Sequence, residues 1–353
     1  MSRVLGLVVS MLGWLSLIAF AGAYLGYYVP PEALWSLQIL ALALPVIVLA
    51  LIPLTILSFV TGHARLGIAQ VVAVLLFALR HIPFGFVGTE DAADAPDAIQ
   101  LLTYNSKAGN TARSEDSSLV DLFEAINPDV ACLQEYLVIP TRSDRIPAGM
   151  LSRAFYSMGY QTATGVSPSQ PETRRPILTR FPIVEEEILS LGRATQSYAV
   201  RAVLSGPGGD FAVYNLHFQG FTADRPWRGG SVLSAGDWID FFQKSRGAYL
   251  SRATEARALR VHLESEPNPF LVCGDLNTTS NHWDYRHIAR GLYDAFERAG
   301  EGWGKTYHAR FPIVRIDYVL ASSTWSVMSS EVHGPLSSDH RPLTATLRLR
   351  GPE

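Results

Sequence analysis

Charged residues are scarce in this sequence of 353 residues, and cysteine is almost absent. Asp, Glu, Lys and Arg make up 17% of the chain, against roughly 25% in typical soluble proteins. The net charge of −3 excludes the global basic field that drives non-specific nucleic-acid binding, although a local basic cleft is still allowed. The deficit of charge indicates that part of the chain is unusually apolar.

The two cysteines, Cys132 and Cys273, each lie in a short apolar run that is typical of a buried strand. The simpler interpretation is that both are buried free thiols that pack as small apolar side chains. A disulfide would need neighbouring strands with close Cβ atoms, which a sequence cannot show. Cysteine usage therefore leaves the redox compartment open.

The scarcity of charge is concentrated at the N-terminus. Three apolar stretches, residues 4–28, 33–60 and 66–87, are each long enough to cross the roughly 30 Å hydrocarbon layer as a helix. The connections between them are short, so consecutive helices run antiparallel. We expect residues 1–89 to form a transmembrane anchor of three helices, although Arg80 and His81 interrupt the third stretch.

The first stretch also resembles a signal peptide, because residues 21–23 read Ala-Gly-Ala. Its apolar core is longer than such peptides have, which favours retention as a membrane helix. Arg3 and Arg65 place the N-terminus and the second loop in the cytoplasm by the positive-inside rule, whereas Arg80 and His81 act against this if they flank the last span. The predicted localisation is a plasma or inner membrane, with everything after the third span on the extracytoplasmic side.

The remainder of the chain alternates between strand-like and helix-like runs. Residues 90–98 are acidic and alanine-rich, which is typical of a linker, and residues 117–126 have the apolar spacing of an amphipathic helix. Residues 99–350 are expected to form a layered α/β or α+β domain. Strands are predicted for seven runs: 99–104, 129–134, 197–204, 211–216, 270–273, 316–320 and 343–349.

Polar residues that can bind metals or move protons follow the predicted strands, where loops carry sites on a rigid scaffold. Each of these motifs is weak by itself, because a lone carboxylate or histidine at a strand end is more often a cap or a surface residue. Their succession is more specific. In chain order they are Asn105, Gln134-Glu135, Asn215-Leu216-His217, Gly274-Asp275-Leu276-Asn277, Ile316-Asp317-Tyr318 and Ser338-Asp339-His340.

This succession resembles the endonuclease/exonuclease/phosphatase family, also called the pancreatic-deoxyribonuclease-like fold, from about Ile99 to Leu349. Supporting matches are residues 127–130 and 177–183, and Thr306 upstream of Asp317. The resemblance implies an α/β fold, a four-layer sandwich of two packed sheets flanked by helices, preceded here by the transmembrane helices. It also implies a metal-dependent phosphoric ester hydrolase with its catalytic domain at 99–350.

Hydrolysis of a phosphoester requires neutralised phosphoryl oxygens and an oriented water. Oxygen ligands suit Mg²⁺, with Mn²⁺ as an alternative. Glu135 is the expected metal ligand, and by the resemblance Asn105 assists it and Asp339 completes the metal environment. Many family members carry an acid or amide two residues after the first Asn, but Lys107 stands there in this chain and is not assigned to metal.

The resemblance assigns the remaining motif residues to catalysis. Asp275 would orient or deprotonate the attacking water, and Asn277 would hold either the phosphate or the aspartate. His340 would contact the phosphoryl group, with its tautomer fixed by Asp317. His217 would donate to a phosphate oxygen or protonate the leaving group. Which residue is the true base stays open at this point.

Substrate identity is less determined than reaction class. A tethered site meets lipids at high local concentration, so a lipid or lipid-linked phosphodiester is slightly favoured over the alternative of an endonuclease or exonuclease. A catalytically inactive membrane scaffold is a further alternative. The expected partners are the phosphoester substrate and the lipid bilayer, and no obligate protein partner is inferred.

Selectivity is expected in residues 220–260, part of which, 236–263, has a helical pattern. Its aromatic residues would either pack in the core or form a rim of the active site that contacts a lipid or a nucleobase. They are Trp227, Trp238, Phe241 and Phe242. Arg174 and Arg175 could contact phosphate, although solvation at the surface is the favoured interpretation.

Overall fold

The structure is a computed structural model that describes residues 3–81, 97–107, 117–136, 150–165, 173–194, 196–221, 226, 230–310 and 313–350. The chain divides into two compact units. The helical unit comprises residues 1–84, 221–253 and 279–286. The sandwich unit comprises residues 85–220, 254–278 and 287–353.

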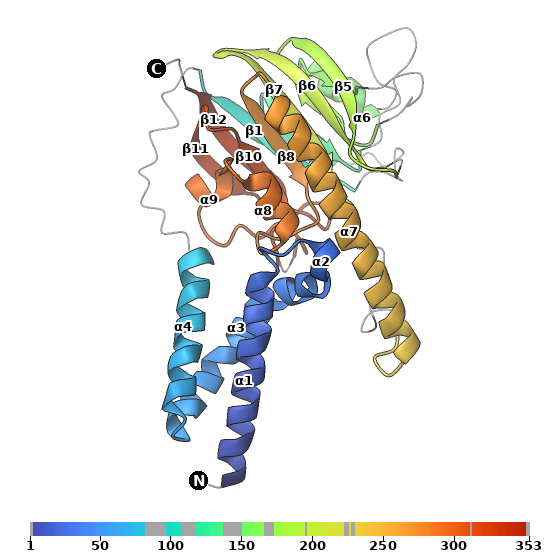
Figure 1. Ribbon diagram of the computed structural model, residues 1–353. Coiled ribbons are helices and arrows are strands. Elements are labelled where there is room, and N and C mark those ends of the chain that lie inside the picture. The colour runs from blue at the N-terminus through green and yellow to red at the C-terminus, as the bar shows by residue number, and fades with distance from the viewer. Residues whose placement is uncertain are drawn as a thin grey trace. The chain divides into compact units, whose positions relative to one another are not determined.

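Four helices form the N-terminal part of the helical unit. They are α1 (Arg3–Leu25), the short α2 (Pro31–Leu34), α3 (Ser36–Val60) and α4 (Ala64–His81). In Figure 1, α1, α3 and α4 run alongside one another, and their contact is apolar, with Phe20, Leu44, Leu51 and Ala73 in one buried cluster. Many of their other large apolar side chains are exposed.

By length and composition, α1 and α3 are both able to cross a membrane. The 18 residues of α4 carry Arg65 and Arg80 close to its two ends, so its uncharged part is shorter than that of the other two. The rest of the third expected span, residues 82–87, and residues 90–96 of the expected linker lie outside the described residues. Three spans therefore stay a prediction.

Two mixed, six-stranded sheets form the sandwich unit, as the α/β sandwich prediction requires (Figure 1). The first sheet has the order β11 (Trp325–Val332), β12 (Leu343–Leu349), β1 (Ile99–Asn105), β2 (Val130–Gln134), β4 (Ile177–Thr179) and β3 (Gln161–Ala163). The second has the order β5 (Ile183–Ser190), β6 (Tyr198–Gly206), β7 (Gly209–His217), β8 (Phe270–Asp275), β10 (Asp317–Ala321) and β9 (Tyr293–Asp294).

The inner faces of the sheets pack on each other because alternate side chains of every central strand are apolar. Phe211 and Trp325 meet edge to face in this core, with ring centroids 5.2 Å apart. On the outer face of the first sheet, α5 (Ser117–Ile126) and α6 (Met150–Ser157) bury Phe123 and Phe155 against β1 and β2. The predicted helix 117–126 is confirmed.

The long helix α7 (Ala235–Ser265) begins in the helical unit and ends in the sandwich unit. Within the sandwich unit, Glu255 of α7 accepts hydrogen bonds from the Ser197 hydroxyl and from the backbone N–H of Gln219. Two shorter helices follow β8, namely α8 (Trp283–Ala289) and α9 (Ala295–Ala299). The flanking helices of the predicted fold are therefore present, and the fold prediction is confirmed.

Candidate functional site

The sheet register brings the predicted site residues to one edge of the sandwich. β1 pairs parallel with β2, so Asn105 lies beside Gln134, the residue before Glu135. β7 pairs parallel with β8, which sets His217 beside Asp275, and antiparallel β10 sets Asp317 beside Asp275 as well. Residues far apart in the chain thus meet because the strands that carry them end or begin at the same edge.

Asp275 is the centre of this cluster. Its Oδ2 atom accepts a hydrogen bond from Asn105 Nδ2 at 3.1 Å and lies 3.5 Å from His217 Nε2 and 3.6 Å from His340 Nε2. Only 1% of the residue is exposed. Burial raises the pKa of Asp275, an effect that the facing His340 and His217 rings limit.

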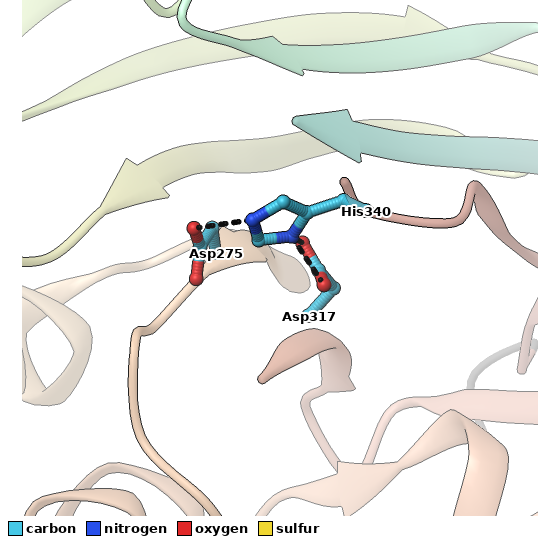
Figure 2. Close-up of side chains that lie close together, drawn as sticks. All are labelled: Asp275, Asp317 and His340. Atoms are coloured by element: carbon cyan, nitrogen blue, oxygen red, sulfur yellow. Dashed lines mark hydrogen bonds and ion pairs between the residues drawn. The ribbon is translucent and has the colours of Figure 1, made fainter. Parts of the chain in front are cut away.

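His340 lies between two carboxylates, as Figure 2 shows. Its Nδ1 atom is 2.9 Å from Asp317 Oδ2, and its Nε2 atom faces Asp275. Burial alone would lower the pKa of His340, but Asp317 and Asp275 outweigh this and raise it to about 10. The Thr306 hydroxyl accepts hydrogen bonds from the Ile316 and Asp317 N–H groups, which fixes the start of β10.

The pKa of His217 is shifted in the opposite direction. Burial lowers its pKa to about 4, with Asp275 acting against that effect and Arg175 and His340 adding to it. The site therefore pairs an imidazolium at position 340 with a neutral imidazole at position 217. Neighbouring groups whose environments separate their pKa values are typical of acid and base assignments.

Asn277 and Gly274 hold the Asp275 loop in place. Asn277 has a φ of 49°, its N–H donates to Asp275 Oδ1 at 2.8 Å, and its side chain donates to the Phe218 carbonyl at 3.0 Å. Of the two roles expected for Asn277, this geometry favours orientation of the aspartate. Gly274 has a φ of +138°, and a Cβ there would overlap the Leu216 carbonyl oxygen, so only glycine fits.

The donor set on the open side of the cluster fits a divalent metal ion. Glu135 is half-buried, adopts a φ of 54°, and accepts a hydrogen bond from Asn105 Nδ2 at 3.3 Å. The Glu135 carboxylate and the Asn105 amide oxygen, which here accepts the Lys107 N–H at 3.2 Å, are ligands of the kind that Mg²⁺ prefers. These two residues are the better candidates for holding a metal, because a strained, partly exposed carboxylate at a strand end is typical of a functional position.

A second group, Asp275, Asp317 and His340, also has its ligand atoms within 4.8 Å of one another. An imidazolium has no lone pair for a metal, and His340 Nδ1 is already engaged by Asp317. We therefore assign this group to proton chemistry. Asp339, the third expected ligand, forms an ion pair with Lys107, whose ammonium lies 2.8 Å from its carboxylate.

Sequence reasoning missed two features of the site: a hydrogen bond between the two sheets, and the burial of Arg175. Gln134 Nε2 donates to Asn215 Oδ1 at 2.8 Å, a buried hydrogen bond between β2 of one sheet and β7 of the other. Both residues stand in the quoted motifs, but only their neighbours Glu135 and His217 were assigned roles. The motif positions themselves were the available signal.

The surface interpretation of Arg175 is wrong. The residue is 3% exposed, and its guanidinium donates to the backbone carbonyls of Tyr198 and Gln196 and lies 4.0 Å from the Tyr198 ring centroid. It is a buried cation beside the cluster. A pair of adjacent arginines gave no signal that one of them would point inward.

The described aromatic residues of the 220–260 stretch belong to the helical unit. Trp238, Phe241 and Phe242 contact one another on the first half of α7, and Phe242 also lies against Trp35, with ring centroids 6.5 Å apart. Trp227 lies outside the described residues. The predicted helix 236–263 is confirmed by α7.

Comparison with known proteins gives a family and a fold. Residues 102–340 match the model of the Endonuclease/Exonuclease/phosphatase family. A functionally unknown protein from Enterococcus faecalis V583 is similar in structure (TM-score 0.51, 16% identity, 71% of this chain and 100% of that chain). So is a family protein from Leptotrichia buccalis C-1013-b (TM-score 0.50, 17% identity, 71% and 100%). Among curated proteins, no match to this chain is found.

Proposed function

Because the chain belongs to the endonuclease/exonuclease/phosphatase family, whose members hydrolyse phosphoester bonds, we propose that it is a membrane-anchored, metal-dependent phosphodiesterase. Its proposed substrates are lipid or lipid-linked phosphodiesters. The observation that carries the reaction is the buried Asp275, His340 and Asp317 cluster (Figure 2), which Asn105 links by hydrogen bonds to the Glu135 carboxylate.

In the proposed reaction, Asp275 accepts a proton from the attacking water. Its raised pKa makes it a stronger base than an ordinary carboxylate. Asn277 and Asn105 orient it through their hydrogen bonds. Glu135 and Asn105 would hold Mg²⁺, or Mn²⁺, and a cation there neutralises phosphoryl charge.

The two histidines divide the remaining work. His340 is held as an imidazolium by Asp317 and donates to a phosphoryl oxygen, where negative charge develops. His217 is neutral, and its Nε2 atom faces the same Asp275 oxygen as His340 does, so it is placed to hydrogen-bond a second phosphoryl oxygen or the leaving oxygen. The reaction releases an alcohol and a phosphomonoester.

The helical unit supports a lipid substrate. The part of α7 between Phe242 and Tyr249 lies beside α2 and the start of α3, through Phe242 and Trp35 and through the Tyr249 hydroxyl, which donates to the Gln38 carbonyl at 3.3 Å. This segment is therefore at an end of the apolar helices. Leu233, just before α7, is 93% exposed, and Ile239 is exposed on the helix.

Arginines and tyrosines gather at the same end of the apolar helices. The guanidinium of Arg80 lies 3.4 Å from the Tyr27 ring centroid, and that of Arg286 lies 4.8 Å from the Tyr28 ring centroid. Tyrosine and arginine are enriched where a membrane helix meets the head groups. Exposed apolar residues such as Leu233 and Ile239 are suited to contact with the lipid surface.

The full chain, purified in detergent and returned to phospholipid vesicles with Mg²⁺, tests the proposal by hydrolysis of phospholipids, DNA, RNA and inositol phosphates. We expect phospholipid hydrolysis that EDTA abolishes and that Mg²⁺ or Mn²⁺ restores, with Glu135→Gln requiring the most added metal. Hydrolysis of nucleic acid alone would mean that the substrate is a nucleic acid and not a lipid. Full activity of metal-free protein in chelator would contradict metal dependence, and no hydrolysis by folded protein would favour an inactive scaffold.

Two matched variants test whether the protein acts on lipid at a membrane surface. Leu233→Asp should lower hydrolysis in vesicles by about tenfold, while hydrolysis of a soluble chromogenic phosphodiester is unchanged, because a charge at an apolar contact weakens interfacial binding. Val261→Asp is the control, since Val261 is 67% exposed on the second half of α7, in the sandwich unit. Equal vesicle activity of the two variants would contradict contact between Leu233 and lipid.

A further inference from the structure

Two sulfur atoms meet in the centre of the sandwich. Cys132 lies on β2 of the first sheet and Cys273 on β8 of the second, and both belong to the buried core between the sheets. Their exposed fractions are 0% and 1%. The structure contains them as free cysteines whose Sγ atoms are 2.7 Å apart.

We propose that Cys132 and Cys273 form a disulfide bond that joins the two sheets through the core. A separation of 2.7 Å is well inside the roughly 3.5–4.0 Å at which non-bonded heavy atoms pack best. The bonded distance in a disulfide is about 2.05 Å, so the two sulfurs lie only about 0.7 Å beyond it. Both cysteines lie on central strands of their sheets, so the bond would join two strands that are held on both sides and would not involve a chain terminus.

The bond would form while the domain folds. The cysteines of the finished core are inaccessible, and burial raises the pKa of Cys132, which disfavours the reactive thiolate. During folding, one thiolate attacks a disulfide of a thiol oxidoreductase, and the second thiolate then displaces the enzyme from the mixed disulfide. Two cysteine thiols lose two protons and two electrons, and the oxidoreductase disulfide becomes a dithiol.

The disulfide would act on the geometry of the site. Cys132 lies three residues before Glu135, and Cys273 two residues before Asp275. A bond between them would tie the strand that carries the proposed metal ligand to the strand that carries the proposed base. It would add a covalent link to the Gln134–Asn215 hydrogen bond, which joins the same two sheets.

A thiol count on the full chain tests the bond. The inference rests on the proposed extracytoplasmic position of the sandwich unit, because disulfides persist in oxidising compartments. Protein is extracted from its membrane in the presence of an alkylating agent, unfolded, and measured by intact mass. We expect no alkylated cysteine before reduction and two after it. Two alkylated cysteines without reduction would overturn the proposal, and the count does not depend on whether the protein hydrolyses any substrate.

Stability provides a second measurement with matched variants. Cys132→Ala, Cys273→Ala and the double variant should all lower the melting temperature by a similar amount, on the order of 10 °C, because any of them removes the same cross-link. After the wild-type protein is unfolded and refolded with reductant, its melting temperature should fall by a comparable amount. Additive losses in the two single variants, with no effect of reductant on the wild type, would show two independent thiols.

Discussion

At the scale of the residue, Asp275 and His340 carry the sharpest expectation. His340→Ala and Asp275→Asn should each lower the turnover number by at least about two orders of magnitude, the effect of losing a positioned acid or base. Initial rates on the substrate found in the screen measure this, with circular dichroism to verify folding. Near-wild-type turnover in either folded variant would refute the assignment.

His333→Ala is the matched control for the histidine variant. His333 is half-buried and hydrogen-bonds Thr344, on a strand that contributes no residue to the Asp275 cluster. We expect its turnover number to stay within about twofold of the wild-type value, since surface and peripheral substitutions rarely reach the reacting groups.

Glu266 gives a prediction about pH. The carboxylate is buried and accepts hydrogen bonds from Arg201 at 2.7 Å and from the Tyr214 hydroxyl at 2.6 Å. Burial alone would raise its pKa, but Arg201 and Tyr214 lower it to about 2, from an ordinary value of 4.5. A carboxyl whose folded pKa lies below its unfolded pKa stabilises the fold above the unfolded value and loses that contribution as pH falls toward the folded one.

The wild-type sandwich should therefore lose stability between pH 4.5 and about 2, as Glu266 becomes protonated. Glu266→Gln should be less stable at pH 7 and should show a shallower decline over that interval. Melting temperatures of both proteins as a function of pH measure the difference. Parallel pH profiles would mean that Glu266 does not have a depressed pKa.

At the scale of the element, the hydrogen bond between β2 and β7 is the feature to perturb. Gln134→Met and Asn215→Leu should each cost about 1–3 kcal/mol, because each leaves buried polar partners unsatisfied. The double variant should cost less than the sum, since both ends of the Gln134–Asn215 bond are then gone. Unfolding free energies in denaturant measure the coupling, and additivity within about 0.5 kcal/mol would mean that the bond is not shared.

The buried central strands could be predicted from sequence, because their apolar runs are long and end in polar motif residues. β1, β2, β7 and β12 match the expected ranges closely. The prediction missed the short strands β3, β4 and β9, and the longer strands β5 and β11. β5 carries Glu185, Glu186 and Glu187 in succession and lies at an edge of its sheet, so it has no continuous apolar run to recognise.

The site residues could be predicted as a set, but their connections could not. Motif order identified Asp275, Asp317 and His340, and the structure brings them together. The buried position of Arg175 and the ion pair between Lys107 and Asp339 depend on which residues face them from distant parts of the chain. One sequence does not contain that information in a local pattern.

At the scale of the whole molecule, composition indicated the apolar N-terminus, and α1 and α3 have the length and composition to span a membrane. The membership of the helical unit could not be predicted. Residues 221–253 and 279–286 were expected in the soluble domain, but they group with the apolar helices. Gln38 is one reason, since its side chain accepts a hydrogen bond from the Trp283 N–H.

Topology is tested by reporters fused after Glu353. Arg3 and Arg65 favour a cytoplasmic N-terminus, and three spans would then export the C-terminus. A fusion to alkaline phosphatase, which is active outside the cytoplasm, should therefore be active, and a fusion to a cytoplasm-active reporter should be silent. Signal from the cytoplasmic reporter alone would reverse the proposed orientation.

The hydrogen atom that stands in place of a side chain at Gly274 limits how this site can be redesigned. Leu216 and His217 are neighbours on β7, so any carbon added at position 274 would push that strand aside and move His217 with it. Libraries that seek a new substrate range should keep position 274 fixed. Substitutions are better placed at exposed positions such as Leu233, which is 93% exposed, because a new side chain there displaces no packed neighbour.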